Sequence, residues 1–142
     1  MTQAAANTLN RLLLIEYRSL PMFVAETSPW RGPGAEKAAE TIENITLDQR
    51  EYTARLVQMI QQLGDRPEFG SYPIAFTDMQ MLSVDYLLIE LVQRQRRIVP
   101  AVEACVAALE TGTAARALAD EILGSEKAHL EALEELVAPA TA

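Results

Sequence analysis

The sequence predicts an all-α protein in which four long helices pack as a four-helix bundle. Apolar residues recur every three or four positions through four long stretches, and no stretch alternates with period two for long enough to indicate a strand. Short connections rich in turn-forming residues follow the first and third stretches, whereas a longer connection follows the second. That longer middle connection allows a crossover between two helical hairpins.

The first two helices are expected at about residues 2–27 and 35–63. Pro21 has no backbone N–H, so it should bend the first helix near its middle. The segment SPWRGPG, residues 28–34, is expected to form a turn, and Gly64 should end the second helix. The apolar residues on these two stripes are Leu9, Leu12, Leu13, Leu20, Phe23 and Val24, then Ile42, Ile45, Leu56, Met59 and Leu63.

The third helix is expected to begin near Thr77 or Asp78, either of which could cap it, and to continue to about Leu109. Pro100 should kink this helix. The fourth helix is expected from Thr113 to about Val137. The four helices account for nearly the whole chain, which we interpret as one domain over residues 1–142.

The composition excludes several classes of function. The 142 residues are 49% hydrophobic and 23% charged, which is an ordinary globular balance, and the net charge of −8 argues against binding to nucleic acid or to anionic membranes. A single cysteine, Cys105, excludes a disulfide framework and a thiolate metal site. The N-terminal apolar run is broken by Glu16 and Arg18, so we expect no signal peptide or membrane span and a cytoplasmic location.

Polar residues on the core-facing stripes are the functional signal. Glu16 falls on the stripe of the first helix, and Glu126 and His129 fall one turn apart on that of the fourth. Glu90 interrupts the apolar run YLLIELV at the flank of the third stripe. The second helix places Gln49 and Tyr52 at inward positions, within TLDQREYTARL.

Buried carboxylates need a compensating charge, because burial without a partner costs several kcal/mol or keeps the group protonated. A divalent cation would supply that charge, since carboxylates and imidazole are suitable ligands for iron, manganese or zinc. Each residue alone also has a structural interpretation. Glu16 could pair with Arg94 or Arg97, and Tyr52 could be a core tyrosine whose hydroxyl reaches a partner.

These residues, in this order, resemble the ferritin-like di-iron superfamily, in particular bacterioferritin and rubrerythrin. The segments LNRLLLIEY, MLSVDYLLIEL and EILGSEKAHLEALEEL resemble the ligand-bearing segments of its first, third and fourth helices. The resemblance implies a ferritin-like bundle, a homodimer, and metal ligands at Glu16, Glu90, Glu126 and His129. No segment for a fifth helix follows the fourth helix, so a storage cage is not expected.

The second helix departs from the family pattern. Where the family has a bridging glutamate and a histidine, this chain has Gln49 and Tyr52. Three alternatives follow: a single Fe, Mn or Zn ion on the remaining ligands, a ferric ion bound by Tyr52 as phenolate, or no metal. In the metal-free alternative, Gln49 donates a hydrogen bond to Glu16 or Glu126, and the Tyr52 hydroxyl donates to another carboxylate.

Two functional hypotheses result. The first is a protein with an altered, mononuclear metal site in the bundle core and a residual redox role. The second is a metal-free, noncatalytic ferritin-like module with a structural or interaction role. Enzymatic turnover, the substrate and the redox partner are left open by the sequence.

Overall fold

The computed structural model describes residues 2–27, 35–81 and 84–137. Within these ranges the elements are all helices and no strand is formed, so the all-α prediction is confirmed. The expected turn at residues 28–34 lies outside the described residues. The elements are α1 (Thr2–Tyr17), α2 (Leu20–Thr27), α3 (Ala35–Gln62), the 3-10 helix η1 (Ile74–Met81), α4 (Val84–Ala108) and α5 (Ala114–Val137).

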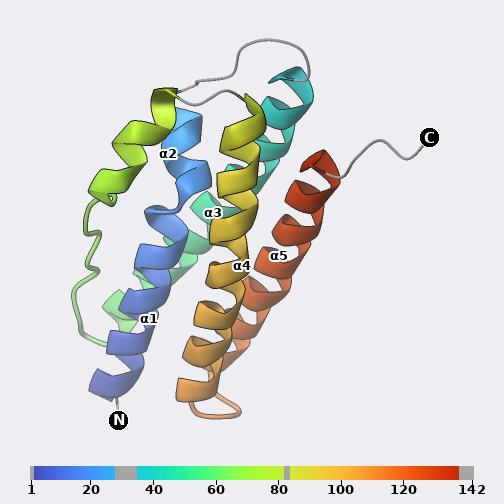
Figure 1. The fold of residues 1–142 in the computed structure, drawn as a ribbon. Helices are drawn as coiled ribbons and strands as arrows, with labels where there is room; N and C mark the ends of the chain where they lie inside the picture. The colour runs from blue at the N-terminus through green and yellow to red at the C-terminus, as the bar shows by residue number, and fades with distance from the viewer. Residues whose placement is uncertain (1, 28–34, 82–83, 138–142) are drawn as a thin grey trace.

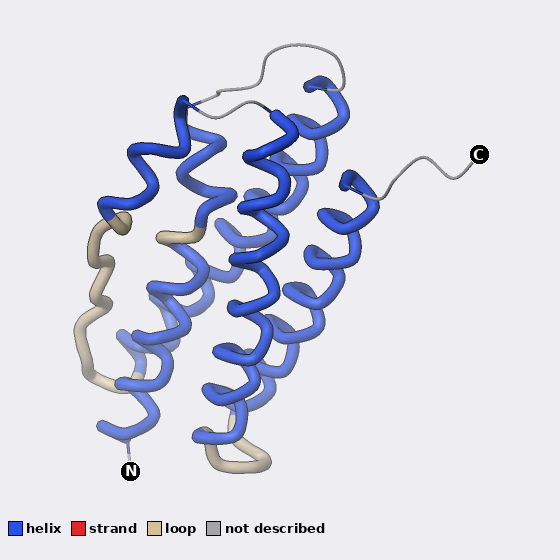
Figure 2. The backbone as a smooth tube through the Cα atoms, viewed as in Figure 1, coloured by secondary structure: helices blue, strands red, loops and turns tan. Residues whose placement is uncertain are grey.

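The long helices lie side by side along one common direction (Figure 1). From the end of the molecule that holds the N-terminus, α1 and α2 run to the opposite end, and α3 returns (Figure 1). The connection after α3 then climbs along the outside of the molecule to η1 (Figure 2). As a result α3 and α4 run in the same direction, and α5 runs opposite to α4. The most extensive helix contact joins α4 to α5, and the next joins α1 to α3.

The first expected helix is divided in two. Instead of one bent helix, α1 ends at Tyr17 and α2 starts at Leu20. Ser19 caps α2, because its Oγ accepts a hydrogen bond from the Met22 backbone N–H at 3.2 Å. Pro21 therefore lies in the first turn of a new helix, where its missing N–H has no intrahelical partner to lose. The Ser-Leu-Pro sequence starts a helix instead of bending one.

The expected start of the third helix is also wrong. Residues 74–81 form η1, and α4 begins only at Val84. Phe76 holds η1 in place: it is 3% exposed, and its ring centroid lies 5.6 Å from that of Phe23 and 6.2 Å from that of Tyr72. Pro100 is inside α4, which continues to Ala108.

The core has two apolar clusters, one on each side of a polar layer. The cluster nearer the N-terminal end includes Leu9, Leu56 and Val102, and the other includes Leu20, Ile42 and Leu91. On α3, α4 and α5, the buried polar residues fall between the segments that supply the two clusters. None of the described helices has the length and hydrophobicity needed to cross a membrane.

Replacing Ser19 by alanine should destabilise the fold more than removing an ordinary helix cap. The change removes the α2 cap, worth about 0.5–2 kcal/mol, and also a hydrogen bond to the buried Gln49 side chain at 2.7 Å. Thr113→Ala is the matched control, because Thr113 caps α5 through the Arg116 N–H and is not fully buried.

Urea unfolding of the two variants measures the difference. We expect Ser19→Ala to lower the free energy of unfolding by about 2 kcal/mol or more and Thr113→Ala by about 1 kcal/mol. Equal losses would show that the Ser19 contact with Gln49 does not contribute.

Candidate functional site

The polar layer between the two apolar clusters is the candidate functional site. Residues from α1, from the link between α1 and α2, and from α3, α4 and α5 contribute to it. Its side chains are almost entirely removed from solvent, since each is 5% exposed or less. They are Glu16, Ser19, Gln49, Gln95, Glu126 and His129.

Glu126 of α5 is the centre of this layer. Gln49 donates from Nε2 to Glu126 Oε2 at 3.2 Å. Gln95 donates from Nε2 to the Glu126 backbone carbonyl at 2.9 Å and to Oε1 at 3.3 Å. Oε1 also contacts Nδ1 of His129, one turn along the same helix. Burial by itself would raise the pKa of Glu126, but the hydrogen bonds from His129 and Gln49 and the His129 charge lower it overall.

His129 links this buried carboxylate to one at the surface. Its Nδ1 faces Glu126, whereas its Nε2 lies 2.9 Å from Oδ2 of Asp48 on α3. Ser125 Oγ is 3.3 Å from the same Nε2. Burial alone would lower the pKa of His129, but hydrogen bonds and charges from Glu126 and Asp48 outweigh it and raise the pKa. The imidazolium form can donate to both carboxylates at once.

Glu16 is the most strongly perturbed acid of the layer. It is fully buried, and neither of its carboxyl oxygens receives a donor from the described residues. Burial first, and then the negative charge of Glu126, raises the pKa of Glu16 well above its ordinary value. Of these two carboxyl groups, Glu16 is therefore the one that we expect to hold a proton.

Two of the six predicted site residues lie outside this network. Glu90 on α4 is only half-buried and forms no hydrogen bond or ion pair with the described residues of the layer. Tyr52 packs half-buried against the apolar cluster nearer the N-terminal end, with the Arg55 guanidinium 5.5 Å from its ring centroid. Burial, followed by the charge of Glu121, raises the Tyr52 pKa, which disfavours a phenolate ligand.

Sequence reasoning missed Gln95, Asp48 and Ser19. Gln95 occupies the place on α4 that was expected for Glu90, and the buried series Leu88, Leu91 and Gln95 would have indicated it. Asp48 flanks the inward stripe of α3 and its side chain is 53% exposed, so a pattern of buried positions does not indicate it. Ser19 lies between two helices, where helical periodicity gives no signal. The alternative pairing of Glu16 with Arg94 or Arg97 is not formed among the described residues.

The residues of the layer do not fit the dinuclear centre of the ferritin-like pattern. Glutamines occupy the α3 and α4 positions that face Glu126, so two negative ligands are missing. Tyr52, the position expected for an imidazole, is not in the network. Within the described part of the chain, no three Asp, Glu, Cys or His side chains converge to form a ready-made metal site.

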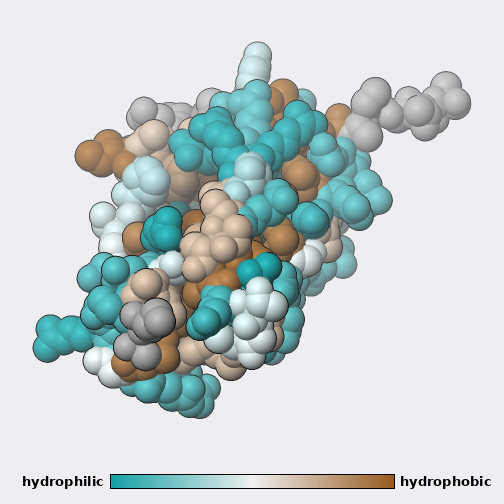
Figure 3. Space-filling view, turned by 90° about the horizontal axis from the view of Figure 1, so that it is seen from below, coloured by the Kyte–Doolittle hydropathy of each residue, from teal (hydrophilic) through white to brown (hydrophobic). Residues whose placement is uncertain are grey.

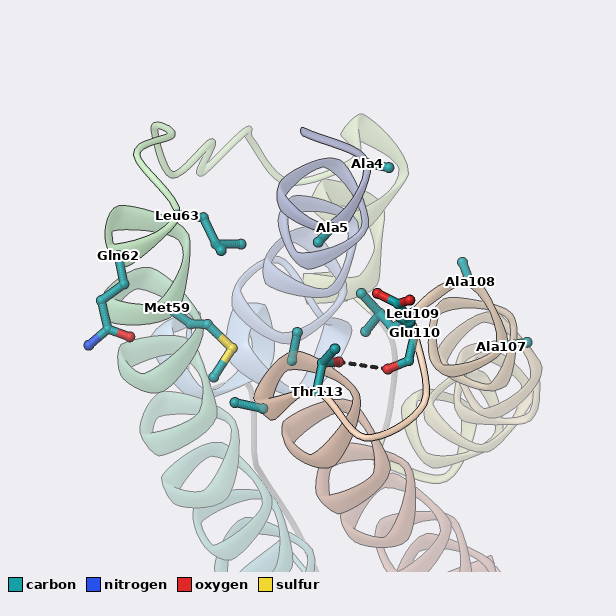
Figure 4. A pocket seen from close by; sticks show the side chains of 12 residues that line it. Ala4, Ala5, Met59, Gln62, Leu63, Ala107, Ala108, Leu109, Glu110 and Thr113 are labelled. Carbon is teal, nitrogen blue, oxygen red and sulfur yellow. Dashed lines mark hydrogen bonds between the residues drawn. The ribbon is translucent and has the colours of Figure 1, made fainter. Parts of the chain in front are cut away.

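A cavity lies away from the polar layer, at the end of the molecule that holds the N-terminus. It has a volume of about 590 Å³ and is lined by side chains such as Ala5, Met59, Leu63 and Leu109 (Figure 4). Seen from this end, hydrophobic residues gather inside a mainly hydrophilic rim (Figure 3). Glu110 is the one titratable residue that lines it. The polar layer is therefore the better candidate for chemistry.

Comparisons of the chain with protein families, with curated proteins and with solved structures find no match. The resemblance to the ferritin-like superfamily therefore stays a prediction from the residues themselves.

His129 should titrate above the ordinary imidazole pKa of about 6.5, because Glu126 and Asp48 stabilise its protonated form. It is the only histidine in the chain, so NMR follows its ring nitrogens without ambiguity. Asp48→Asn should lower this pKa, whereas Asp85→Asn, an exposed position on α4, should leave it unchanged. A wild-type pKa at or below the ordinary value would contradict the arrangement.

The same titration has a consequence for stability. A raised pKa in the folded state means that the stabilisation is fully present below the pKa of the unfolded chain and is lost as pH rises through the folded pKa. The free energy of unfolding should therefore fall as pH rises above the ordinary imidazole pKa of about 6.5 and through the raised pKa of folded His129. The raised pKa of Glu16 also makes the free energy of unfolding fall as pH rises. His129→Gln should therefore reduce this pH dependence of stability without abolishing it.

Proposed function

We propose that the chain is a ferritin-like four-helix bundle that has replaced a metal centre by a hydrogen-bonded polar layer, and that it serves as a noncatalytic structural or interaction module. The observation that supports this proposal is the set of contacts that Glu126 makes. Gln49, Gln95 and His129 each place a nitrogen against this carboxylate or its backbone carbonyl. Donors from three helices thus occupy the place where the ferritin-like pattern has ligands to cations.

Charge balance supports the same proposal. Glu16 is neutral in this arrangement, and the His129 imidazolium lies between the Glu126 and Asp48 carboxylates. Within the buried part of the layer one positive charge therefore matches one negative charge. A buried ion pair is stable only when hydrogen bonds satisfy its remaining polar atoms, and the two glutamines supply those bonds.

Helix directions support the ferritin-like part of the proposal. The parallel run of α3 and α4, joined by a connection that returns along the outside, is the arrangement expected for two hairpins linked by one crossover (Figure 1). The homodimer that the resemblance implies stays a prediction.

A single bound ion is the second candidate, and a specific observation favours it. Both oxygens of Glu16 and Oε1 of Gln95 are buried acceptors without a donor among the described residues, and a cation would satisfy such atoms. Glu16, Glu126 and His129 would hold it, and Asp48 would orient the imidazole from the far side. Iron or manganese there would supply redox chemistry, and zinc would act as a Lewis acid.

Metal analysis of protein purified without an affinity tag decides between the two candidates. If the polar layer replaces a metal, the purified protein should contain far less than one Fe, Mn or Zn ion per chain. Neither a chelator nor added metal should then change its melting temperature. One ion per chain that is lost in both Glu126→Ala and His129→Ala would establish the single-ion site instead. Glu51→Ala, which removes an exposed carboxylate of α3, is the matched control.

Restoring the family pattern tests the ferritin-like register independently. The changes Gln49→Glu and Tyr52→His restore the two residues of the family pattern on α3, and Gln95→Glu adds a carboxylate at the α4 position that contacts Glu126. We expect the triple variant to bind a dinuclear complement of iron and to be less stable than wild type without metal, because its added carboxylates lie beside Glu126. A folded triple variant that binds no iron would contradict the register, whatever the metal content of wild type.

A further inference from the structure

A small cavity lined by arginines lies at the break between α1 and α2. Its volume is about 210 Å³, and Ser19, Phe76 and Ile98 are among its lining residues. Arg18, Arg94 and Arg97 line it as well. Three cationic side chains around one cavity stand out in a chain whose net charge is −8.

The arginines of this cavity have no carboxylate partner among the described residues, unlike several arginines elsewhere in the chain. Arg55 pairs with Glu121 and Arg96 pairs with Glu134, at 2.8 and 2.9 Å. By contrast, no described carboxylate pairs with Arg18, Arg94 or Arg97. Arg18 is nonetheless occupied, because it donates to the backbone carbonyls of residues 69 and 70.

Arg94 and Arg97 are therefore the residues free to bind an anion. The Arg94 guanidinium is stacked 4.6 Å from the ring centroid of Phe76, which restricts its orientation. Its Nε is buried and has no acceptor among the described residues. A buried donor without an acceptor destabilises the fold, so an acceptor from outside the chain would bind favourably here. Arg97, three residues along α4, adds a second guanidinium to the same cavity.

The remaining walls select the kind of anion. Apolar side chains, among them Leu20, Phe76 and Ile98, form most of the lining. Guanidinium groups bind carboxylates through paired hydrogen bonds, and apolar walls favour a hydrocarbon body over a fully hydrated ion. The volume is below the roughly 300–1,000 Å³ of typical ligand pockets, which limits the ligand to a few carbon atoms or one ring.

We propose that this cavity binds a small organic monocarboxylate, with its carboxylate on Arg94 and Arg97 and its apolar body against Phe76 and Ile98. The proposal does not depend on whether the polar layer holds a metal. The two sites are adjacent, however, because Ser19 lines the cavity and donates its hydroxyl to Gln49, which in turn donates to Glu126.

NMR titration with benzoate and with butyrate tests this assignment. Each should shift the backbone amide signals of Ser19, Ile98 and Ala101 saturably. The neutral analogues benzamide and butyramide should bind at least about tenfold more weakly, because they lack the charge that guanidinium recognises. Inorganic phosphate should neither shift these signals at the same concentrations nor displace benzoate.

Substitutions assign the binding to the two arginines. Arg97→Gln, at an exposed position, should weaken benzoate binding about tenfold or more without changing the circular dichroism spectrum. Arg94→Gln should have at least the same effect. Arg50→Gln is the matched control, because it removes the same charge from an exposed position on α3 and should leave the affinity unchanged.

Four results would overturn the proposal. Equal binding of benzoate and benzamide would mean an apolar cavity without anion recognition. Phosphate binding at the same residues with equal or higher affinity would mean a general anion site. The absence of saturable shifts, or an equal loss of affinity in Arg50→Gln and Arg97→Gln, would mean that no specific site exists.

Discussion

The buried carboxylate of Glu126 is the constraint on which the rest of the core depends. A charged group with no solvent exposure must be matched by charge and by hydrogen bonds, or the fold loses several kcal/mol. Here the match comes from side chains of α3, α4 and α5 themselves. The contacts from Gln49 and Gln95 fix α3 and α4 relative to α5. The polar layer therefore specifies how the helices align along their common direction.

This layer also explains local features that seem unrelated to it. The division between α1 and α2 places Ser19 where it caps α2 and also donates to Gln49. The same break opens the arginine-lined cavity on the other side of Ser19. One hydroxyl thus connects helix termination, the buried network and a candidate ligand site. A continuous helix over residues 2–27 would not supply a free capping hydroxyl at this position.

Periodicity predicted the helical class and the inward positions of Glu16, Gln49, Glu126 and His129, because burial on a helix repeats with its turn. It failed where tertiary contacts decide. The α4 contribution is Gln95 instead of Glu90, since the apolar run around Glu90 hides which face is inward. Half-exposed Asp48 joins the site only because its carboxylate reaches across to α5, and a pattern of buried positions cannot indicate such a contact.

The protonation state of Glu16 tests the account most directly. If hydrogen bonds replace a metal, we expect Glu16 to be a neutral acid at pH 7, since burial and the charge of Glu126 raise its pKa well above its ordinary value. Infrared difference spectroscopy between wild type and Glu16→Gln should then show the carbonyl stretch of one protonated carboxylic acid, present only in wild type. Loss of a carboxylate band instead, with no protonated-acid band in wild type, would show that Glu16 is ionised and would contradict the account.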